Sequence, residues 1–217
     1  MSGIRYLLFD LDNTLYTNAS GLFTEVGERI EGWISATLAL TLDEARALRQ
    51  RWFLDHGTAM SGLMKEHPEL DVDAYLDYVH DIDVSRYLGP NPARAEMLRD
   101  LPAPKSVFTN SIRSWAERIT RQLGIRDCFE EIYDVRAVGY RSKPDPRAFM
   151  WVLEQLGLPA SAVVILDDQV SYLAGATAVG MHTVLVHKGA EAVDGIEYQV
   201  DGILEAVPLL KRLLGVA

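Results

Sequence analysis

Three apolar stretches of the sequence each end in side chains that could bind a metal ion or a phosphate group. The three sets are Asp10, Asp12 and Thr14 after Tyr6–Phe9, Thr109 and Asn110 after 106–108, and Asp167 and Asp168 after 162–166. A fourth set, Lys143 followed by Pro144, stands between the second and third sets. Short apolar stretches are typical of buried strands, and the carboxyl ends of parallel strands meet at one sheet edge. The sequence therefore predicts that all four sets converge.

The chemistry of these residue types is that of phosphoryl transfer. Clustered carboxylates repel one another unless a cation intervenes, and all-oxygen ligands suit Mg²⁺, whereas Zn²⁺ is disfavoured because these motifs contain no His or Cys. Lys143 supplies a compact positive charge for a phosphate oxygen, while Thr14 and Thr109 supply hydroxyl groups. A carboxylate can act as nucleophile and form an aspartyl-phosphate, and a second carboxylate can act as general acid and base. The alternative is that these polar residues only cap helices and turns. Capping alone does not readily explain four such sets at one edge of the sheet.

The first motif also makes a geometric prediction. If the first strand continues through Asp12, the side chains of Asp10 and Asp12 share one face, because side chains repeat every second residue along a strand. The two carboxylates then lie close together at the strand end.

The elements that must position these residues alternate between strand and helix in the second part of the chain. Strands are expected at 106–108, 131–133, 162–166 and 182–186, and helices at 93–101, 112–123, 145–156, 170–179 and 203–214. This order predicts an α/β fold with a doubly wound parallel sheet. Residues 17–92 have helical periodicity throughout, and the Gly89–Pro92 cluster of helix breakers ends this segment. We therefore expect a core formed by residues 1–16 and 93–217, with residues 17–92 inserted as a helical domain.

Composition excludes several classes of function. The 217 residues have a formal net charge of -10, which argues against binding nucleic-acid polymers or anionic membranes. A single cysteine, Cys128, rules out an intrachain disulfide bond and a cysteine metal cluster. No signal peptide or long apolar span is evident, so the sequence predicts a soluble cytoplasmic protein, either a monomer or a homodimer.

The four motifs, in this order and spacing, resemble those of the haloacid dehalogenase (HAD) superfamily of phosphatases. The resemblance implies a Rossmann-like core in which Asp10 is the nucleophile and Asp12 the general acid and base. It implies that Thr109 and Lys143 hold the phosphoryl group, and that Mg²⁺ binds Asp10, the Asp12 backbone carbonyl and Asp168, with Asp167 assisting. Thr14 and Asn110 are further candidate phosphate contacts. An Asp at position 12 argues against a dehalogenase, since that branch generally lacks it.

The helical insertion resembles a C1 cap, and its amino-acid sequence resembles that of the cap in the pyrimidine 5′-nucleotidase branch. The matching stretches are Arg51–Thr58 and Tyr87–Pro90, and the first implies a substrate-facing cap segment in which His56 is a candidate contact. Packing within the cap is the alternative for His56. In the fourth motif, Gln169 and Tyr172 stand where the family usually has Ser and Asn, side chains that support the lysine and the metal shell.

The expected function is a Mg²⁺-dependent phosphatase for a small phosphomonoester, with a nucleoside 5′-monophosphate favoured. Two alternatives stay open. One is another small ester, such as a sugar phosphate or phosphoglycolate. The other is a catalytically weak phosphate-binding protein, for which Gln169 and Tyr172 are the only support.

Overall fold

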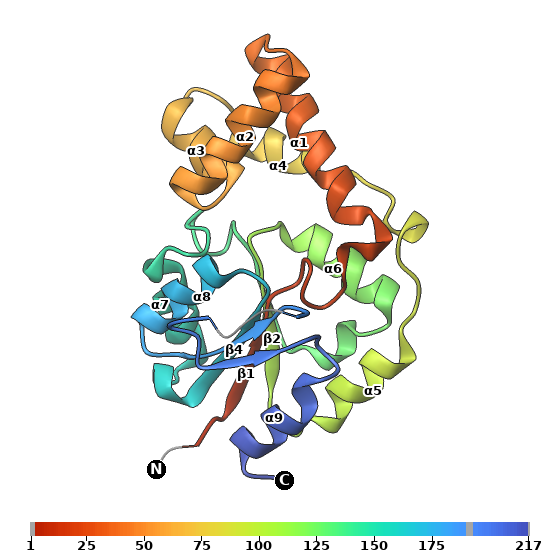
Figure 1. The fold of residues 1–217 in the computed structure, drawn as a ribbon, viewed down its shortest axis with the longest axis vertical. Helices are drawn as coiled ribbons and strands as arrows, with labels where there is room; N and C mark the ends of the chain where they lie inside the picture. Colours follow the sequence, from red (N-terminus) through yellow and green to blue (C-terminus); the bar gives the residue numbers. More distant parts are fainter. Residues whose placement is uncertain (1–2, 190–192, 217) are drawn as a thin grey trace.

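The computed structural model describes residues 3–189 and 193–216, and its centre is a parallel β-sheet (Figure 1). Within these residues the sheet has six strands in the order β3-β2-β1-β4-β5-β6. The strands are β1 (Tyr6–Phe9), β2 (Lys105–Phe108), β3 (Ile132–Tyr133), β4 (Val163–Asp167), β5 (His182–Val186) and β6 (Tyr198–Val200). All neighbouring pairs are parallel, and the chain order reverses on the two sides of β1. The predicted doubly wound parallel sheet is therefore confirmed, with β6 as an additional edge strand.

Helices cover both faces of this sheet because β1 is apolar on both sides. Leu7 and Phe9 belong to one buried cluster, to which α5, α6 and α9 contribute, whereas Tyr6 and Leu8 belong to a second, to which α7 and α8 contribute. These helices are α5 (Pro92–Asp100), α6 (Arg113–Leu123), α7 (Pro146–Leu156), α8 (Val170–Ala178) and α9 (Ala206–Leu214). The last helix was expected from residue 203, but Ile203 lies before its first turn.

Four further helices lie together beyond the carboxyl edge of the sheet (Figure 1). They are α1 (Leu22–Leu38), α2 (Leu42–His56), α3 (Ala59–Glu66) and α4 (Val72–Val79). Helix α2 begins at a capping box formed by Thr41 and Glu44 and ends at Gly57, which has a positive φ of 81°. Short 3₁₀ helices occur at Asn18–Ser20, Val84–Arg86, Arg126–Cys128 and Ala160–Ala162. The expected all-helical insertion after the first strand is therefore present, and we refer to α1–α4 as the cap.

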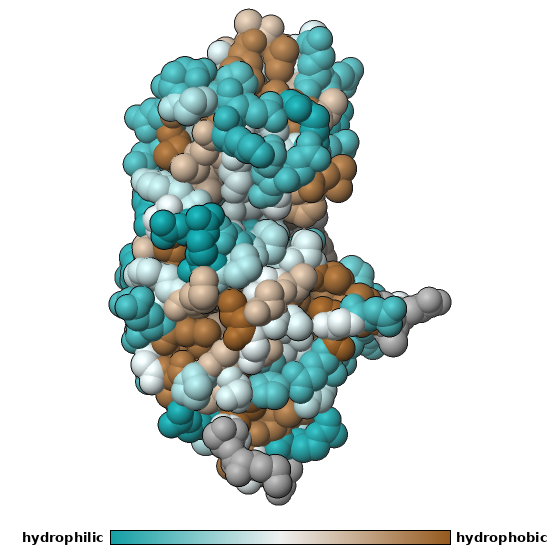
Figure 2. Space-filling view, turned by 90° about the vertical axis from the view of Figure 1, so that its left-hand side faces the viewer, coloured by the Kyte–Doolittle hydropathy of each residue, from teal (hydrophilic) through white to brown (hydrophobic). Residues whose placement is uncertain are grey.

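The cap has its own packed interior. Trp52 of α2 is fully buried, and the absence of a side chain at Gly62 of α3 lets the indole ring lie directly against that helix. On the face shown in Figure 2, hydrophobic side chains are scattered among hydrophilic ones over both the cap and the sheet layer. No helix in the described residues is long and apolar enough to cross a membrane.

Candidate active site

A buried lysine joins two aspartates at the carboxyl edge of the sheet. The Nζ atom of Lys143 lies 2.8 Å from Oδ1 of Asp10, just after β1, and 2.6 Å from Oδ2 of Asp167, the last residue of β4. It also donates a hydrogen bond of 3.1 Å to the Phe108 carbonyl oxygen at the end of β2. The ends of three adjacent strands therefore meet at one ammonium group, as the sequence predicts.

The charged side chains of this cluster shift one another's pKa values. Burial alone lowers the pKa of Lys143, but Asp10 and Asp167 together raise it above its ordinary value, so the lysine stays charged. Burial raises the pKa of both Asp10 and Asp167, and the positive charge of Lys143 acts in the opposite direction. One ammonium balances only one of the two buried carboxylates, so the other needs either a proton or a second cation.

A third carboxylate completes a candidate metal centre. Asp10, Asp167 and Asp168 each offer one oxygen atom, and these atoms lie within 4.8 Å of one another. The Asp168 carboxylate is held by Asn13 Nδ2 at 3.0 Å and by Gln169 Nε2 at 2.7 Å. An all-oxygen ligand set with excess negative charge is suited to a hard divalent cation. Gln169, which replaces the family's usual Ser, therefore orients a candidate metal ligand.

Asp12 differs from the expected geometry. Strand β1 ends at Phe9, and Asn13 has a positive φ of 69°, so the strand does not continue through Asp12 and the two aspartates share no strand face. The Asp12 carboxylate instead accepts three hydrogen bonds, from the Tyr16 hydroxyl at 2.6 Å, the Ser111 hydroxyl at 2.7 Å and the Trp115 indole at 2.9 Å. Its side chain is outside the carboxylate group described above. The expected metal contact of Asp12 is through its backbone carbonyl, and it stays a prediction.

The second motif fixes the lysine loop to the sheet edge. Asn110 accepts a hydrogen bond of 2.7 Å from the Lys143 backbone N–H and donates one of 3.0 Å to the Lys143 carbonyl oxygen. The Thr109 hydroxyl oxygen accepts a hydrogen bond of 3.0 Å from the backbone N–H of Ser111. Thr109 and Asn110 both line the cavity above the carboxylates.

Two of the predicted substrate contacts lie elsewhere. The Thr14 hydroxyl is buried without a hydrogen-bond partner among the described residues, and Thr14 is not one of the residues lining the cavity. His56 also lies outside the lining, with its Nε2 atom 3.7 Å from Glu66 Oε1. The cavity-facing residues of α2 include Phe53 and Leu54, and His56, further along the helix, lies beside Glu66 of α3. These placements do not support direct substrate contacts by Thr14 or His56.

Tyr172 has a role that sequence reasoning missed. Its ring centre lies 5.4 Å from the Lys143 ammonium nitrogen, and its hydroxyl donates a hydrogen bond of 3.0 Å to the carbonyl oxygen of Gly57 in the cap. The ring also meets Phe53 of the cap edge-on, with 6.5 Å between ring centres. The residue that replaces the family's usual Asn therefore supports the lysine by a cation–π contact and joins the core to the cap.

The turn between α2 and α3 rests on the lysine loop. A Cβ atom at Gly57 would lie 2.7 Å from Cδ of Pro144, so only glycine permits this close approach. The Ser142 hydroxyl lies 2.7 Å from that of Ser61 and 3.3 Å from that of Thr58. The peptide bond between Lys143 and Pro144 is cis. Cap and core therefore meet at the loop that carries the catalytic lysine candidate.

A cavity of about 550 Å³ lies between the cap and the carboxylates, within the range typical of small-molecule sites. Its floor includes Asp10, Asp12 and Asp168. Its roof comes from faces of all four cap helices, α1 to α4, and is apolar except at a few positions. The apolar roof residues are Phe23, Val26, Ile30, Phe53, Leu54, Met60, Leu76 and Val79.

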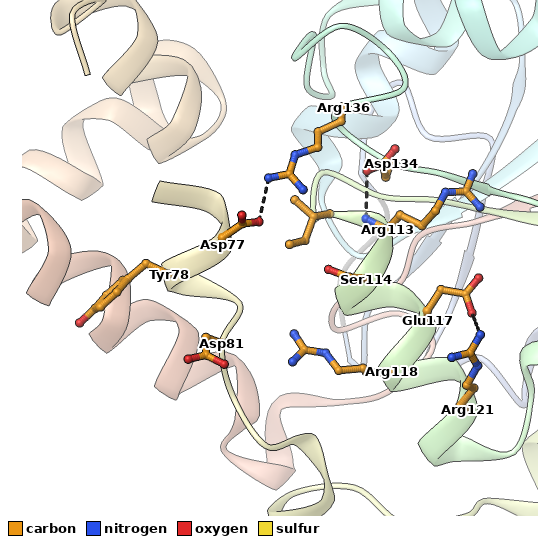
Figure 3. A pocket seen from close by; sticks show the side chains of 11 residues that line it. Asp77, Tyr78, Asp81, Arg113, Ser114, Glu117, Arg118, Arg121, Asp134 and Arg136 are labelled. Carbon is orange, nitrogen blue, oxygen red and sulfur yellow. Dashed lines mark hydrogen bonds and ion pairs between the residues drawn. The ribbon is translucent and has the colours of Figure 1, made fainter. Parts of the chain in front are cut away.

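A larger, open groove of about 1160 Å³ runs between α4 and α6 (Figure 3). Two pairs of its charged side chains form ion pairs with one another. Arg136 donates to Asp77 at 2.8 Å, and Arg121 lies 2.7 Å from Glu117. Its lining, as far as the structure describes the chain, contains none of the four motif sets. This groove is therefore a polar contact region between cap and core, distinct from the candidate active site.

Comparison with known proteins gives relatives that are named phosphatases. The chain is 28% identical over 231 residues to glyceraldehyde 3-phosphate phosphatase of Methanocaldococcus jannaschii, covering 97% of this chain and 98% of that protein. It is 26% identical over 229 residues to phosphoglycolate phosphatase of Pectobacterium atrosepticum, covering 99% and 94%. Phosphate metabolism protein 8 of Saccharomyces cerevisiae is 28% identical over 215 residues, which are 92% of this chain but 65% of the yeast protein. The chain thus spans less than two thirds of that relative.

Solved structures share the fold. The HAD phosphatase from Thermococcus onnurineus matches with a TM-score of 0.64 at 22% identity, covering 98% of each chain. The putative HAD-hydrolase YfnB from Bacillus subtilis matches with a TM-score of 0.64 at 16% identity, covering 96% of this chain and 99% of that one. The family model for haloacid dehalogenase-like hydrolases matches residues 4–180, which include all four motif sets. The chain therefore belongs to the haloacid dehalogenase-like hydrolase family.

Proposed function

We propose that this hydrolase is a Mg²⁺-dependent phosphatase that acts on a small phosphomonoester through an aspartyl-phosphate on Asp10. The observation that carries the proposal is the buried contact of Lys143 with Asp10 and Asp167, beside Asp168 and beneath a cavity of about 550 Å³. Asp10, Asp168 and the Asp12 carbonyl, with Asp167 assisting, would hold Mg²⁺, which would supply positive charge to offset the repulsion between the nucleophile and the phosphate.

The residues of the chain have separate tasks in this reaction. A carboxylate oxygen of Asp10 forms a bond to phosphorus as the bond from phosphorus to the ester oxygen breaks. Lys143 and Thr109 hold the phosphoryl oxygens, and Asp12 gives its proton to the departing alcohol oxygen. Asp12 then takes a proton from water, whose oxygen attacks phosphorus and releases inorganic phosphate and free Asp10.

The cap cavity supports a leaving group larger than a triose. Its apolar roof, formed by residues such as Phe23 and Phe53, can pack against a planar ring. We therefore favour a nucleoside 5′-monophosphate, with a pyrimidine base, as the proposed substrate class.

Residues 17–92 serve in this proposal as the cap domain over a core of residues 1–16 and 93–217. A cytoplasmic location and a monomeric or homodimeric state remain predictions.

The names of two relatives favour a second candidate. Glyceraldehyde 3-phosphate phosphatase and phosphoglycolate phosphatase act, by their names, on small polar esters, and both align with nearly the whole chain. Gln169 contacts Asp168 and Tyr172 contacts Lys143, which supports an active phosphatase over the alternative of a catalytically weak binding protein.

The test is phosphate release from UMP, CMP, glyceraldehyde 3-phosphate and phosphoglycolate, with and without Mg²⁺, using Asp10→Asn as the control. We expect Mg²⁺-dependent release that favours the nucleotides and is lost in Asp10→Asn. Release favouring a small polar ester would keep the mechanism and change the substrate class. Turnover that survives in Asp10→Asn, or no turnover of any ester, would reject the proposed mechanism.

A further inference from the structure

One arginine interrupts the apolar roof of the cavity. Helix α2 presents Arg49, Gln50, Phe53 and Leu54 to the cavity, a spacing that places them on neighbouring parts of one helical surface. Among the lining residues that the structure describes, Arg49 is the only side chain with a full positive charge. His80, the other basic lining residue, is neutral near pH 7, because burial lowers its pKa to about 4.

Arg49 is held in place by a buried acid. Its NH2 atom lies 3.0 Å from Oε1 of Glu31, a side chain that is 7% exposed, and Arg46 lies 3.2 Å from Oε2 of the same carboxylate. A Cβ atom at Gly27 would lie 3.3 Å from NH1 of Arg49, so the glycine gives the guanidinium room at the cavity wall. Glu31 therefore fixes the orientation of Arg49, while Arg46 has a second acidic partner in Asp43, 3.3 Å away.

The guanidinium also has unused hydrogen-bonding capacity. The Nε atom of Arg49 is buried and has no hydrogen-bond partner among the described residues. A buried donor without a partner is unfavourable, and an acceptor supplied by a ligand removes that deficit. The carboxylates at which the phosphate and metal would bind line the same cavity from the core, whereas Arg49 lines it from helix α2 of the cap. The cavity therefore has negative charge on its core side and one positive charge among the apolar residues of its cap side.

We propose that Arg49 is a specificity-determining residue, which donates hydrogen bonds to an acceptor oxygen at the far end of the leaving group. The matching leaving group has an apolar or planar body and a carbonyl-type oxygen distal to the phosphate, as a pyrimidine base has. This inference rests on the proposed phosphatase function and narrows its substrate class.

The experiment compares two substrates that share the same ester chemistry. UMP and ribose 5-phosphate both release phosphate from a primary alcohol, but only UMP carries a base. Arg49→Met should lower the ratio of kcat/KM for UMP to that for ribose 5-phosphate by about tenfold or more, the effect of losing a charged hydrogen bond.

Arg46→Met is the matched control. Both arginines pair with Glu31, but Arg46 is absent from the cavity lining and its side chain is 52% exposed. Arg46→Met should therefore keep the substrate ratio within about twofold, whereas Arg49→Met does not. Far-ultraviolet circular dichroism and the melting temperature of both variants establish that the cap remains folded.

Three outcomes are decisive against the inference or its basis. If Arg46→Met shifts the ratio as far as Arg49→Met, the effect comes from Glu31 and the inference is wrong. If the unmodified enzyme shows no preference for UMP over ribose 5-phosphate, no acceptor on the base is recognised. If it hydrolyses neither these nor any other phosphomonoester, the proposed function fails first, and the variants are not needed to decide.

Discussion

The Lys143 ammonium lies 5.4 Å from the centre of the Tyr172 ring, so the lysine that joins Asp10 to Asp167 also has an aromatic neighbour. The same tyrosine donates a hydrogen bond to Gly57 in the cap. One side chain thus contacts both the charged centre and the element above it.

Two substitutions separate these contacts of Tyr172. Tyr172→Phe removes the hydrogen bond to the cap but keeps the ring beside Lys143, so we expect mainly a raised KM. Tyr172→Leu removes the ring as well, and loss of a desolvated cation–π contact should lower kcat by about tenfold. Steady-state kinetics on UMP distinguish the two. Equal losses of kcat in both variants would contradict a role for the ring itself.

Asp168 should control the affinity for Mg²⁺. Asp168→Ala removes one of the three carboxylates at the metal centre, so the Mg²⁺ concentration for half-maximal activity should rise at least about tenfold. Mg²⁺ titration of phosphate release measures this change. Asp127→Ala, at an exposed position outside the cavity lining, is the control that should leave the titration as it was. An unaltered titration in Asp168→Ala would remove Asp168 from the metal site.

Trp115 should position Asp12 as the general acid. Trp115→Phe deletes the indole donor to the Asp12 carboxylate, and we expect hydrolysis of UMP, whose leaving alcohol needs a proton, to fall by about tenfold. The comparison uses kcat/KM, which reports formation of the aspartyl-phosphate and not its later hydrolysis. The kcat/KM for 4-nitrophenyl phosphate, whose leaving group departs unprotonated, should fall far less. Trp151→Phe, which alters an edge contact with Tyr133, is the matched control. Equal losses on both substrates would indicate a general packing defect.

His80 should make folding stability depend on pH. Burial lowers the pKa of His80 to about 4 in the folded state, against about 6.5 in the unfolded chain, so the unfolded state binds more protons between these values. The stabilising contribution of the neutral His80 to the free energy of unfolding is fully present above pH 6.5. As the pH falls toward 4, this contribution is lost, and the free energy of unfolding decreases by up to about 3 kcal/mol. Urea denaturation at a series of pH values measures this loss.

His80→Gln isolates that effect from the titration of carboxylates, which both proteins share. The difference in unfolding free energy between the two proteins should shrink or reverse as the pH falls. A difference that stays constant from pH 7 to pH 4 would show that His80 takes up its proton in the folded state.

Two glycines in helices should respond in opposite directions to alanine. A Cβ atom at Gly175 in α8 would overlap the carbonyl oxygen of Pro144, so Gly175→Ala should lower stability by about 1–3 kcal/mol and displace the lysine loop. A Cβ atom at Gly32 in α1 meets nothing within 4 Å, so Gly32→Ala should raise stability by up to about 1 kcal/mol. Thermal denaturation measures both. Equal stability of the two variants would contradict the close approach at Pro144.

The sequence predicts the centre of the fold because apolar strands ending in polar residues leave few alternatives. Asp10, Thr109 and Asp167 converge for that reason, and Lys143 joins them as expected. Strand β6 escapes prediction because Tyr198–Val200 is short and only partly buried, so it lacks the apolar run of a central strand. Its pairing depends on the neighbouring β5, which no local pattern reveals.

The site residues that sequence reasoning missed depend on contacts between distant segments. From the motif alone, Tyr172 indicates only that the usual Asn side chain is missing, because its partner Gly57 lies in the cap, far away in the sequence. Likewise, the donors Ser111, just before α6, and Trp115, in its first turn, reach Asp12 from far along the chain. His56 is near the cavity in sequence, but helical periodicity turns it toward Glu66.

The central position of β1 has a consequence during synthesis of the chain. Tyr6–Phe9 leaves the ribosome first among the strands, yet it pairs with Lys105–Phe108 on one side and Val163–Asp167 on the other. Its backbone groups therefore lack their full set of partners until most of the chain has been made, and a nascent chain stopped before β4 has an open strand edge prone to aggregation. Asp10 likewise meets Lys143 and Asp167 only after most of the chain has been made, so the charged centre of the site assembles late in synthesis.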